Sequence, residues 1–321
     1  MNRVHYRVLS GHGYGLGHVA RARWLAEAIQ QRLGLAPLFF ELSGFAPARA
    51  YLEAAGLPVH PPGAPDPLPP LLEIIDGVDA PEAVLLEARR SGAPVLCFEH
   101  QFAGAGLATV VVNAITAGLE DCRWTAMGIP HVGGPGYLLL DPQVVRLRAL
   151  PRAPMAGAAR RVLVSCGGTD PEGRAGLGLA WLAALRFPGI VDLVLGAGGT
   201  ACPDLPAGLA VRVHRNLPTL APLLHRADLA LISGGMTLYE AACLGTPAAV
   251  IPQNRHQILN AERFQARGAA LLLDPAAGTA PGSLGQLLET PRTRQRMARL
   301  GRGILSGKAP GLWKIINMTL H

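Results

Sequence analysis

The chain has 321 residues, half of them hydrophobic, and this length suits two domains of ordinary size better than one compact core. Lys and Arg number 29 against 22 Asp and Glu, a net charge of +7 that fits an anionic ligand or an acidic membrane surface. The arginines form no basic run and aromatic residues make up only 5%, so the composition argues against nucleic acid as a partner.

The cysteines and the hydrophobic runs indicate the compartment. Five cysteines occur without C-x-x-C spacing, which argues against a disulfide framework and against structural zinc. The N-terminal segment carries Arg3, His5 and Arg7 in place of an apolar leader, and no run of 18 apolar residues follows. We therefore expect a cytoplasmic protein without a transmembrane segment, for which peripheral contact with a membrane stays open.

The first half of the chain alternates short apolar runs with amphipathic stretches, which is typical of a parallel sheet flanked by helices. The expected strands cover residues 4–10, 37–42, 71–76, 94–99 and 108–112. The first helix places Val19, Ala22, Ala26, Ile29 and Leu33 on one face. The proline-rich segment from His60 to Pro70 is expected to be a loop.

A glycine-rich loop follows the first expected strand and leads directly into the first helix. Its sequence, from Ser10 to Arg21, has glycine at alternate positions from Gly11 to Gly17. Open α/β sheets bind their ligands at this end of a strand. The G-x-G-x-x-G pattern of dinucleotide sites fails because Leu16 takes the place of its third glycine, although Glu41 at the end of the second strand leaves that reading as a minor alternative.

His18 is a candidate general base at the start of this helix. The positive end of the helix dipole favours a neutral imidazole, which can take a proton from water or from a sugar hydroxyl. The alternative is a histidine that merely bonds to nearby backbone. Polar residues at the same edge of the sheet could orient it, namely Asp76, Glu99, His100 and Asn113.

We expect no metal site in the chain. His12 and the polar residues around His18 could offer ligands, but no H-x-x-H or H-E-x-x-H pair occurs. A D-x-D pair that could hold a divalent ion at a diphosphate is also absent from the sequence.

The pattern breaks between Asp141 and Arg160 into Pro, Arg and Ala, and a new strand opens at Arg161. We place the domain boundary there, with domains at 1–145 and 146–321. The second half repeats the alternation, with strands expected at 161–165, 190–195, 209–213, 229–232, 248–251 and 269–273. The final helical stretch, 311–320, could return to pack on the first domain.

Two glycine turns in the second half resemble ligand loops. The strand ending at Ser165 leads into Gly167, Gly168 and Thr169, and then into Asp170 and Pro171, which predict an N-cap and the first helical residue. Cys166 is expected to be a small buried side chain rather than a nucleophile. The two glycines would let a ligand approach the backbone.

The segment from Asp228 to Glu240 is the most informative part of the chain. A buried strand runs into Gly234 and Gly235 and then directly into a helix, whose free amides and dipole favour a phosphate group. Thr237 can donate a hydroxyl, and Glu240, one helical turn further, could accept hydrogen bonds from ribose hydroxyls. This predicts a nucleotide site. The alternative is a turn whose glycines only permit tight packing.

A third polar loop, from Pro252 to Ala261, also follows a strand and enters a helix. Asn254, His256 and Gln257 supply amide and imidazole groups suited to sugar hydroxyls. An ordinary polar loop with Asn260 inside the helix is the competing interpretation.

Taken together, these motifs resemble the GT-B superfamily of nucleotide-sugar enzymes. The pattern G-x-G-H-x-x-R follows the first strand, G-G-x-T-x-x-E follows a late strand, and H-Q-x-x-N-A comes next. The resemblance is nearest to the UDP-sugar hydrolase of pseudaminic acid biosynthesis and to spore-coat polysaccharide proteins. Further matching segments are Ile75-Asp76, Gly134–Leu140, Cys166–Asp170 and Ser306–Gly311.

The resemblance implies a GT-B fold, in which two Rossmann-like α/β domains with parallel sheets face each other across a cleft. It implies UDP on the second domain, His18 and Asp76 as the catalytic residues, and inverting attack at the anomeric carbon. Neither a cofactor nor a metal is implied. The substrate-binding residues would be Gly15, Gly17, Arg21, Gly168, Thr169, Gly234, Gly235, Met236, Thr237, Glu240, Asn254, His256 and Gln257.

The acceptor is less well defined than the donor. The hydrolases carry a D-x-Y pattern where this chain has Asp76-Gly77-Val78. The segment from His256 to Ala261 looks more like the transferase that adds N-acetylglucosamine to the peptidoglycan lipid precursor. We expect a UDP-amino-sugar hydrolase of cell-surface glycan biosynthesis, with a glycosyltransferase acting on a glycan or lipid acceptor, or a non-catalytic sugar-nucleotide-binding subunit, as alternatives.

Overall fold

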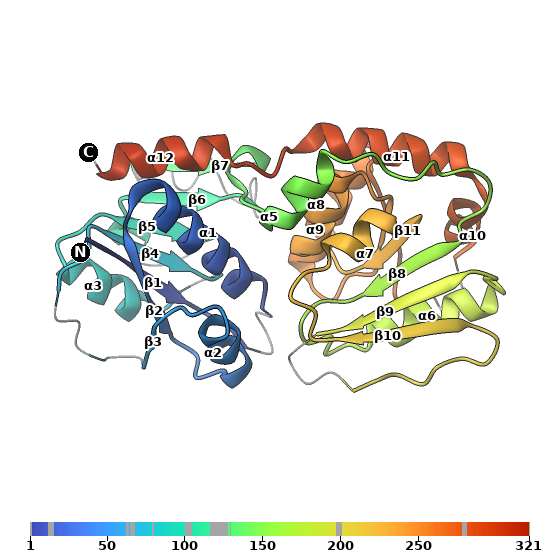
Figure 1. Ribbon diagram of the computed structural model, residues 1–321, viewed down its shortest axis with the longest axis horizontal. Coiled ribbons are helices and arrows are strands. Elements are labelled where there is room, and N and C mark those ends of the chain that lie inside the picture. Colours follow the sequence, from blue (N-terminus) through green and yellow to red (C-terminus); the bar gives the residue numbers. More distant parts are fainter. Residues whose placement is uncertain are drawn as a thin grey trace. The chain divides into compact units, whose positions relative to one another are not determined.

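The computed structural model of the chain forms two compact units (Figure 1). The first consists of residues 1–139 and 308–321, and the second of residues 140–307. The structure describes residues 2–11, 16–61, 64, 68–78, 80–99, 105–115, 128, 130–196, 201–277 and 281–320. The division lies just before helix α5 (Pro142–Arg148), because this helix packs on helices of the second unit. The expected position, 145, falls inside that helix.

The first unit is built on a parallel sheet with the strand order β3-β2-β1-β4-β5-β6-β7. The strands are β1 (Arg3–Val8), β2 (Ala36–Glu41), β3 (Val59–His60), β4 (Leu72–Asp76), β5 (Val95–Phe98), β6 (Val110–Asn113) and β7 (His131–Gly133). The helices are α1 (Gly17–Leu33), α2 (Ala46–Glu53), α3 (Glu82–Arg90), α12 (Pro310–Leu320) and the short η1 (Ala105–Leu107) and η2 (Pro135–Tyr137).

Helix α1 follows the apolar spacing of its sequence. Val19, Ala22, Ala26 and Ile29 are buried, and the helix packs on β1, β2 and β4. It ends at Gly34, whose left-handed φ of 66° lets its amide bond back to Gln30. The helix therefore starts at the carboxyl end of β1, beside the carboxyl end of β4.

The two edge strands of the first unit were not predicted. β3 lies at the start of the proline-rich segment expected to be a loop, and β7 had no strand assigned to it. Both are two or three residues long and none of their residues is fully buried, so neither leaves an apolar run in the sequence.

The second unit contains a parallel sheet with the strand order β10-β9-β8-β11-β12-β13. The strands are β8 (Arg161–Ser165), β9 (Ile190–Leu195), β10 (Ala210–Arg215), β11 (Leu229–Ile232), β12 (Ala248–Val250) and β13 (Ala270–Leu272). Besides α5, the helices are α6 (Arg174–Ala184), α7 (Ala221–Arg226), α8 (Met236–Leu244), α9 (Arg255–Ala266), α10 (Gly282–Glu289) and α11 (Pro291–Ile304).

The core of the second unit explains why its strands read as short continuous apolar runs. Val162, Val164 and Leu193 pack with Leu179 of α6 on one face of the sheet, while α7 and α8 cover the strands from the other. Within the described residues, no helix combines the length and apolar character needed to cross a bilayer.

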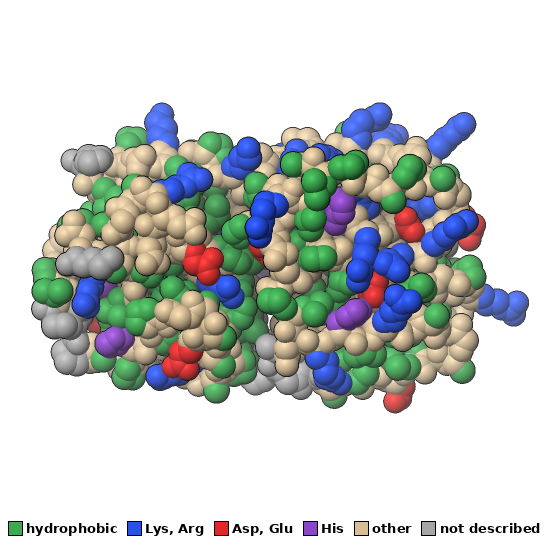
Figure 2. Space-filling model, viewed as in Figure 1, with side chains coloured by type: hydrophobic (Ala, Val, Ile, Leu, Met, Phe, Trp, Pro, Cys, Tyr) green, Lys and Arg blue, Asp and Glu red, His purple; other side chains and the backbone are tan. Residues whose placement is uncertain are grey.

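The excess positive charge of the chain belongs to the second unit. Residues 140–307 contain 18 Arg against 10 Asp and Glu, a net +8, whereas the first unit has 11 Lys and Arg against 12 Asp and Glu, a net −1. Figure 2 shows Lys and Arg side chains spread over the second unit on the face seen there. An anionic ligand is therefore attracted to the second unit rather than to the first.

Candidate active site

His18 and Asp76 meet at the carboxyl edge of the first sheet. His18 is the second residue of α1 and Asp76 is the last residue of β4, and the Nδ1 of His18 lies 2.8 Å from the Oδ1 of Asp76. The His18 side chain is 12% exposed and the Asp76 side chain 1%. The sequence predicted that a polar residue at this edge orients His18, and the structure identifies Asp76 as that residue.

Asp76 is ionised despite its burial. Burial by itself would raise its pKa, but the Arg21 guanidinium and the hydrogen bonds from His18 and Arg21 outweigh it and lower the pKa to about 2. Arg21 donates to both carboxylate oxygens, with its Nε 2.9 Å from Oδ2 and its Nη2 2.5 Å from Oδ1.

The ionised carboxylate fixes the tautomer of the histidine. Because Asp76 can only accept hydrogen bonds, the Nδ1 of His18 carries the proton and donates it. The Nε2 is then left with its lone pair, and no residue in the described part of the chain bonds to it. This is the arrangement of a general base held by a carboxylate.

Arg21 is too buried for the substrate contact that the sequence led us to expect. Its side chain is 1% exposed, and its third hydrogen-bonding nitrogen, Nη1, donates to Glu99 at 2.8 Å. Glu99 follows β5 with a left-handed φ of 51° and accepts the backbone amides of Ala114 and Ile115. Arg21 therefore belongs to the support of His18.

Some of the other residues expected at this site can be placed in the structure, and some cannot. Gly17 opens α1, and Asn113 is buried at the end of β6. Glu41 accepts hydrogen bonds from Ser10, Ser43 and Phe45, which gives it a role in shaping the turn after β2. His12, Gly15 and His100 lie outside the described residues. Where the structure is described, His, Cys, Asp and Glu form no group of three that could hold a metal ion.

The glycine turn of the second unit joins β11 to α8, as predicted. The two glycines differ in what they allow. A Cβ on Gly234 would run into the backbone carbonyl oxygen of Gln257, so that glycine is needed for packing. A Cβ on Gly235 would meet nothing within 4 Å, and its φ of −85° suits any residue. Within the described residues, no atom fills the space in front of Gly235.

Glu240 is a buried carboxylate without a partner. The residue is 7% exposed, and within the described residues nothing bonds to its side chain. Burial, together with the nearby charge of Asp141, raises its pKa to about 8. Buried carboxyl groups ordinarily have hydrogen-bond partners around them, and the described residues provide none for Glu240.

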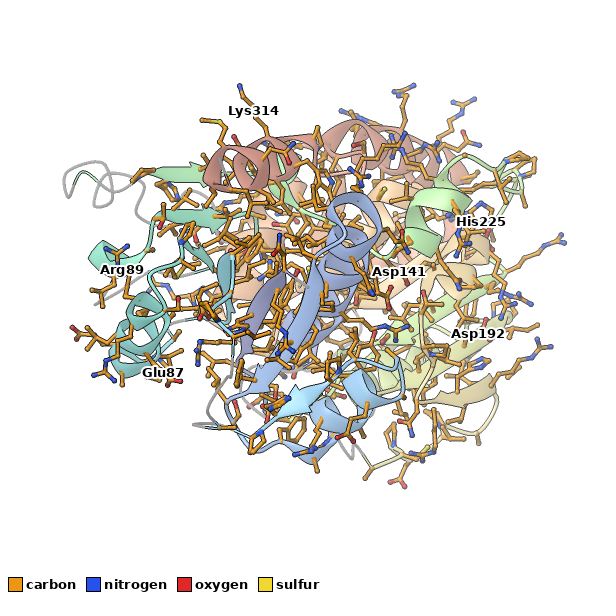
Figure 3. The ribbon with its side chains drawn as sticks, turned by 60° about the vertical axis from the view of Figure 1, so that its left-hand side comes forward. Glu87, Arg89, Asp141, Asp192, His225 and Lys314 are labelled. Atoms are coloured by element: carbon orange, nitrogen blue, oxygen red, sulfur yellow. The ribbon has the colours of Figure 1, made fainter. Side chains whose placement is uncertain are left out.

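Asp141 was not singled out by the sequence motifs. It caps α5 by accepting the amide of Gln143, and it also accepts the hydroxyl of Thr219 in the loop after β10 (Figure 3). Both of its oxygens are bonded, and its charge contributes to the raised pKa of Glu240. Only its place before Pro142, a typical N-cap position, marked it in the sequence.

The polar loop before α9 combines structural and exposed groups. Asn254 caps α9 by accepting the amide of Gln257, and the side chain of Gln257 accepts the amide of Gln253. His256 is partly exposed, and its Nδ1 is buried without a partner in the described structure. Asn260, buried in the helix, donates to the carbonyl of Gly234 at 3.2 Å.

The loop after β8 reaches the same edge of the second sheet. Gln253 donates to the carbonyl of Cys166, and Gly167 has a left-handed φ of 94°. A Cβ on Gly196 would collide with the backbone of Gly168, so the two glycines lie against each other, and Thr169 is partly exposed. Burial raises the pKa of the Cys166 thiol, as expected of a buried side chain rather than a nucleophile.

The prediction for Asp170 was wrong in register. The helix begins at Arg174, and Gly173 is the residue before it. Asp170 instead has a left-handed φ of 40°, from which its carboxylate reaches forward to the amides of Arg174 and Ala175. Asp170 therefore still accepts hydrogen bonds from amides at the start of the helix, although it lies three residues before the N-cap residue, Gly173.

Comparisons with known proteins bear on the second unit most directly. Residues 207–296 match the model of the glycosyltransferase family 28 C-terminal domain, and this segment contains the glycine turn, Glu240 and the start of α9. A UDP-N-acetylglucosamine--N-acetylmuramyl-(pentapeptide) pyrophosphoryl-undecaprenol N-acetylglucosamine transferase of Nostoc punctiforme is 37% identical over 101 residues, 30% of this chain and 28% of that enzyme.

Other comparisons extend over nearly the whole chain. The spore coat polysaccharide biosynthesis protein SpsG of Bacillus subtilis is 27% identical over 319 residues, 92% of this chain and 89% of that protein. The structure of MurG from Acinetobacter baumannii superposes with a TM-score of 0.65 at 18% identity, covering 98% of this chain and 99% of that one. UDP-GlcNAc 2-epimerase from Neisseria meningitidis, bound to UDP-GlcNAc, gives a TM-score of 0.67 at 15% identity and 99% coverage of both chains.

The solved structures share with this chain two α/β units on parallel sheets, the arrangement named GT-B. The family model matches only part of the second unit. The chain is therefore a glycosyltransferase-like enzyme of the GT-B fold, in which residues 207–296 are similar to the glycosyltransferase family 28 C-terminal domain.

Proposed function

We propose that the chain is an inverting glycosyltransferase that takes a UDP-sugar as donor and a hydroxyl of a glycan or lipid as acceptor, in the synthesis of a cell-surface polysaccharide. The observation that carries the proposal is the His18–Asp76 pair, 2.8 Å apart, with the Nε2 of His18 left as a base. A base of this kind is what an acceptor hydroxyl needs in order to attack a sugar.

The donor is assigned to the second unit. The free amides at the start of α8 and the open space before Gly235 suit a diphosphate, and Thr237 can donate its hydroxyl there. The unpartnered carboxylate of Glu240 suits the two hydroxyls of a ribose. Met236, Gly168, Thr169, His256 and Gln257 belong to the same edge and are proposed as further donor contacts.

The proposed reaction uses His18 as the base and the N-terminus of α8 as the binding site for the diphosphate. The Nε2 of His18 takes the proton of the acceptor hydroxyl, and the oxygen attacks the anomeric carbon from the face opposite the phosphate. The bond between that carbon and the phosphate oxygen breaks, and UDP leaves with the electron pair. The amides and the dipole of α8 stabilise its charge. We propose no metal or other cofactor for this step.

The comparisons favour an alcohol over water as the acceptor. The sequence motifs placed a hydrolase first, but both the matching family model and the partial relative from Nostoc punctiforme are glycosyltransferases. The biosynthetic setting rests on the name of the full-length relative from Bacillus subtilis. Water and an alcohol would use the same base, so the distinction is left to experiment.

The test is release of UDP from a panel of UDP-sugars, with and without added glycan and lipid acceptors. We expect release that depends on an acceptor and that is lost in His18→Ala. His214→Ala is the matched control, because His214 is another partly exposed histidine paired with an aspartate, Asp192, at 2.9 Å. Release without any acceptor would assign a hydrolase, and UDP binding without turnover would assign a non-catalytic subunit.

A further inference from the structure

Beneath His18, one buried arginine lies between two buried carboxylates. The guanidinium of Arg21 bonds to Asp76 on one side and to Glu99 on the other, and each of these three side chains is 1% exposed. Arg21 also comes close to the histidine, with its Nη2 3.2 Å from the Nδ1 of His18.

These distances create an electrostatic problem for the base. When His18 takes a proton it becomes a second cation beside Arg21, and like charges at this separation oppose each other strongly in a buried setting. Asp76 alone would have to balance both cations. With Glu99 present, the cluster has two anions, so that the protonated histidine and Arg21 each have a counter-charge.

Glu99 is fixed in place by its backbone and its neighbours. Glu99 follows β5 with a left-handed backbone φ of 51°. Its Oε1 accepts hydrogen bonds from the backbone amides of Ala114 and Ile115 and from the guanidinium of Arg21. A carboxylate bonded in this way cannot turn to solvent without leaving two backbone amides without an acceptor.

Tyr6, Phe98 and Asn113 are described residues around the cluster that carry no charge. Burial, followed by the charge of Asp76, raises the pKa of Tyr6 on β1 well above its usual value, so Tyr6 stays neutral. The ring of Phe98 lies 4.8 Å from the Arg21 guanidinium, and Asn113 ends β6. In the described part of the chain, Asp76 and Glu99 are thus the anions that face Arg21.

We infer that Glu99 is a positioning residue of the reaction, which acts through Arg21 and supplies the second negative charge that the protonated form of His18 requires. The inference rests on the role of His18 in the proposed function. It assigns Glu99 to the step in which the acceptor proton arrives, and not to substrate binding.

The test compares the pH dependence of kcat/KM in the wild type and in Glu99→Gln, whose amide oxygen can still accept the hydrogen bonds now made to Oε1. We expect kcat/KM to fall about ten-fold and its acid limb to move to lower pH by about one unit, because the protonated histidine is disfavoured. KM for the donor and Kd for UDP are expected to stay unchanged.

Two further variants separate charge from structure. Glu41→Gln alters another buried carboxylate that follows a strand of the same sheet and accepts backbone amides, and it should leave the acid limb in place. Combining Arg21→Gln with Glu99→Gln removes one charge of each sign, and should return the acid limb towards the wild-type position. The combined variant also serves if Glu99→Gln alone does not fold.

The outcomes distinguish this inference from the proposed function. An acid limb that stays in place in Glu99→Gln, with activity lost only in proportion to folded protein, overturns the role of Glu99 while leaving His18 as the base. Full activity in His18→Ala overturns the proposed function itself. Thermal melting of each variant gives the folded fraction independently of activity.

Discussion

Asn260 of α9 donates a hydrogen bond to the backbone carbonyl of Gly234, at 3.2 Å, and so ties the glycine turn before α8 to a helix 26 residues further along the chain. The same side chain accepts the hydroxyl of Tyr239 at 3.3 Å. The turn is therefore shaped before any ligand arrives, which lowers the cost of ordering it on binding.

Replacing Asn260 should loosen this turn. In Asn260→Ala the buried carbonyl of Gly234 loses its donor, at a cost of about 1–3 kcal/mol in the free energy of unfolding, and UDP should bind more weakly. Chemical unfolding and calorimetric titration with UDP measure the two effects. Gln265→Ala is the control, since Gln265 on the same helix accepts the amide of Leu272 away from the turn. Unchanged UDP affinity in Asn260→Ala would argue against a preformed turn.

The two glycines of the turn should respond differently to alanine. Gly234→Ala forces a methyl group against the carbonyl of Gln257 and should destabilise the fold by about 2 kcal/mol or more. Gly235→Ala meets no neighbour and should leave the melting temperature unchanged while weakening UDP binding. Equal UDP affinity in Gly235→Ala and wild type would show that no phosphate comes close to this position.

Glu240 should make the stability of the free protein depend on pH. Its pKa is raised from 4.5 to about 8, so the folded chain retains a proton that the unfolded chain has lost over that range. The contribution is complete below pH 4.5 and is lost as the pH rises towards 8, by on the order of 1 kcal/mol per unit. Urea unfolding of wild type and Glu240→Gln at several pH values measures it. A difference between the two that does not change with pH would contradict the assignment.

A second buried charge cluster, on the other face of the first sheet, should affect stability alone. Glu73 accepts a hydrogen bond from Arg7 at 3.0 Å and contacts His5 at 3.1 Å, and Arg7 donates to Glu87 at 2.9 Å. Glu87 lies on α3 (Figure 3). Glu73→Gln removes a negative charge beside the buried Arg7 and should lower the free energy of unfolding by about 3–5 kcal/mol. UDP affinity, measured on folded protein, should not change. Glu53→Gln, at an exposed ion pair with Arg49, should cost less than about 1 kcal/mol.

The sequence predicted the pairing of His18 with a polar strand end because topology alone brings them together. α1 starts where β1 ends, and β4 lies beside β1 with Asp76 as its last residue. Any parallel sheet with this order collects those side chains at one edge. The eleven expected strands are all present, and most of them are buried apolar runs, whereas β10 is largely exposed.

The role of Arg21 could not be read from the sequence. An arginine in the first turns of a helix is ordinarily exposed, and its burial depends on two carboxylates that arrive 55 and 78 residues later. The bond made by Asn260 is likewise not visible in the sequence, because its partner is a backbone carbonyl and every residue has one. The register error at Asp170 arose from a backbone φ of 40°, which local cap signals do not reveal.

The return of the chain at Lys308 affects how the protein is assembled. Helix α12 belongs to the first unit, where Gly311 lies against the ring of Tyr137 and Trp313 stacks under Arg32, with 4.2 Å between the guanidinium carbon and the ring. Residues 140–307 are contiguous and can complete their sheet while translation continues. The first unit cannot be completed until helix α12 has been made, whereas the second unit needs no residue beyond 307.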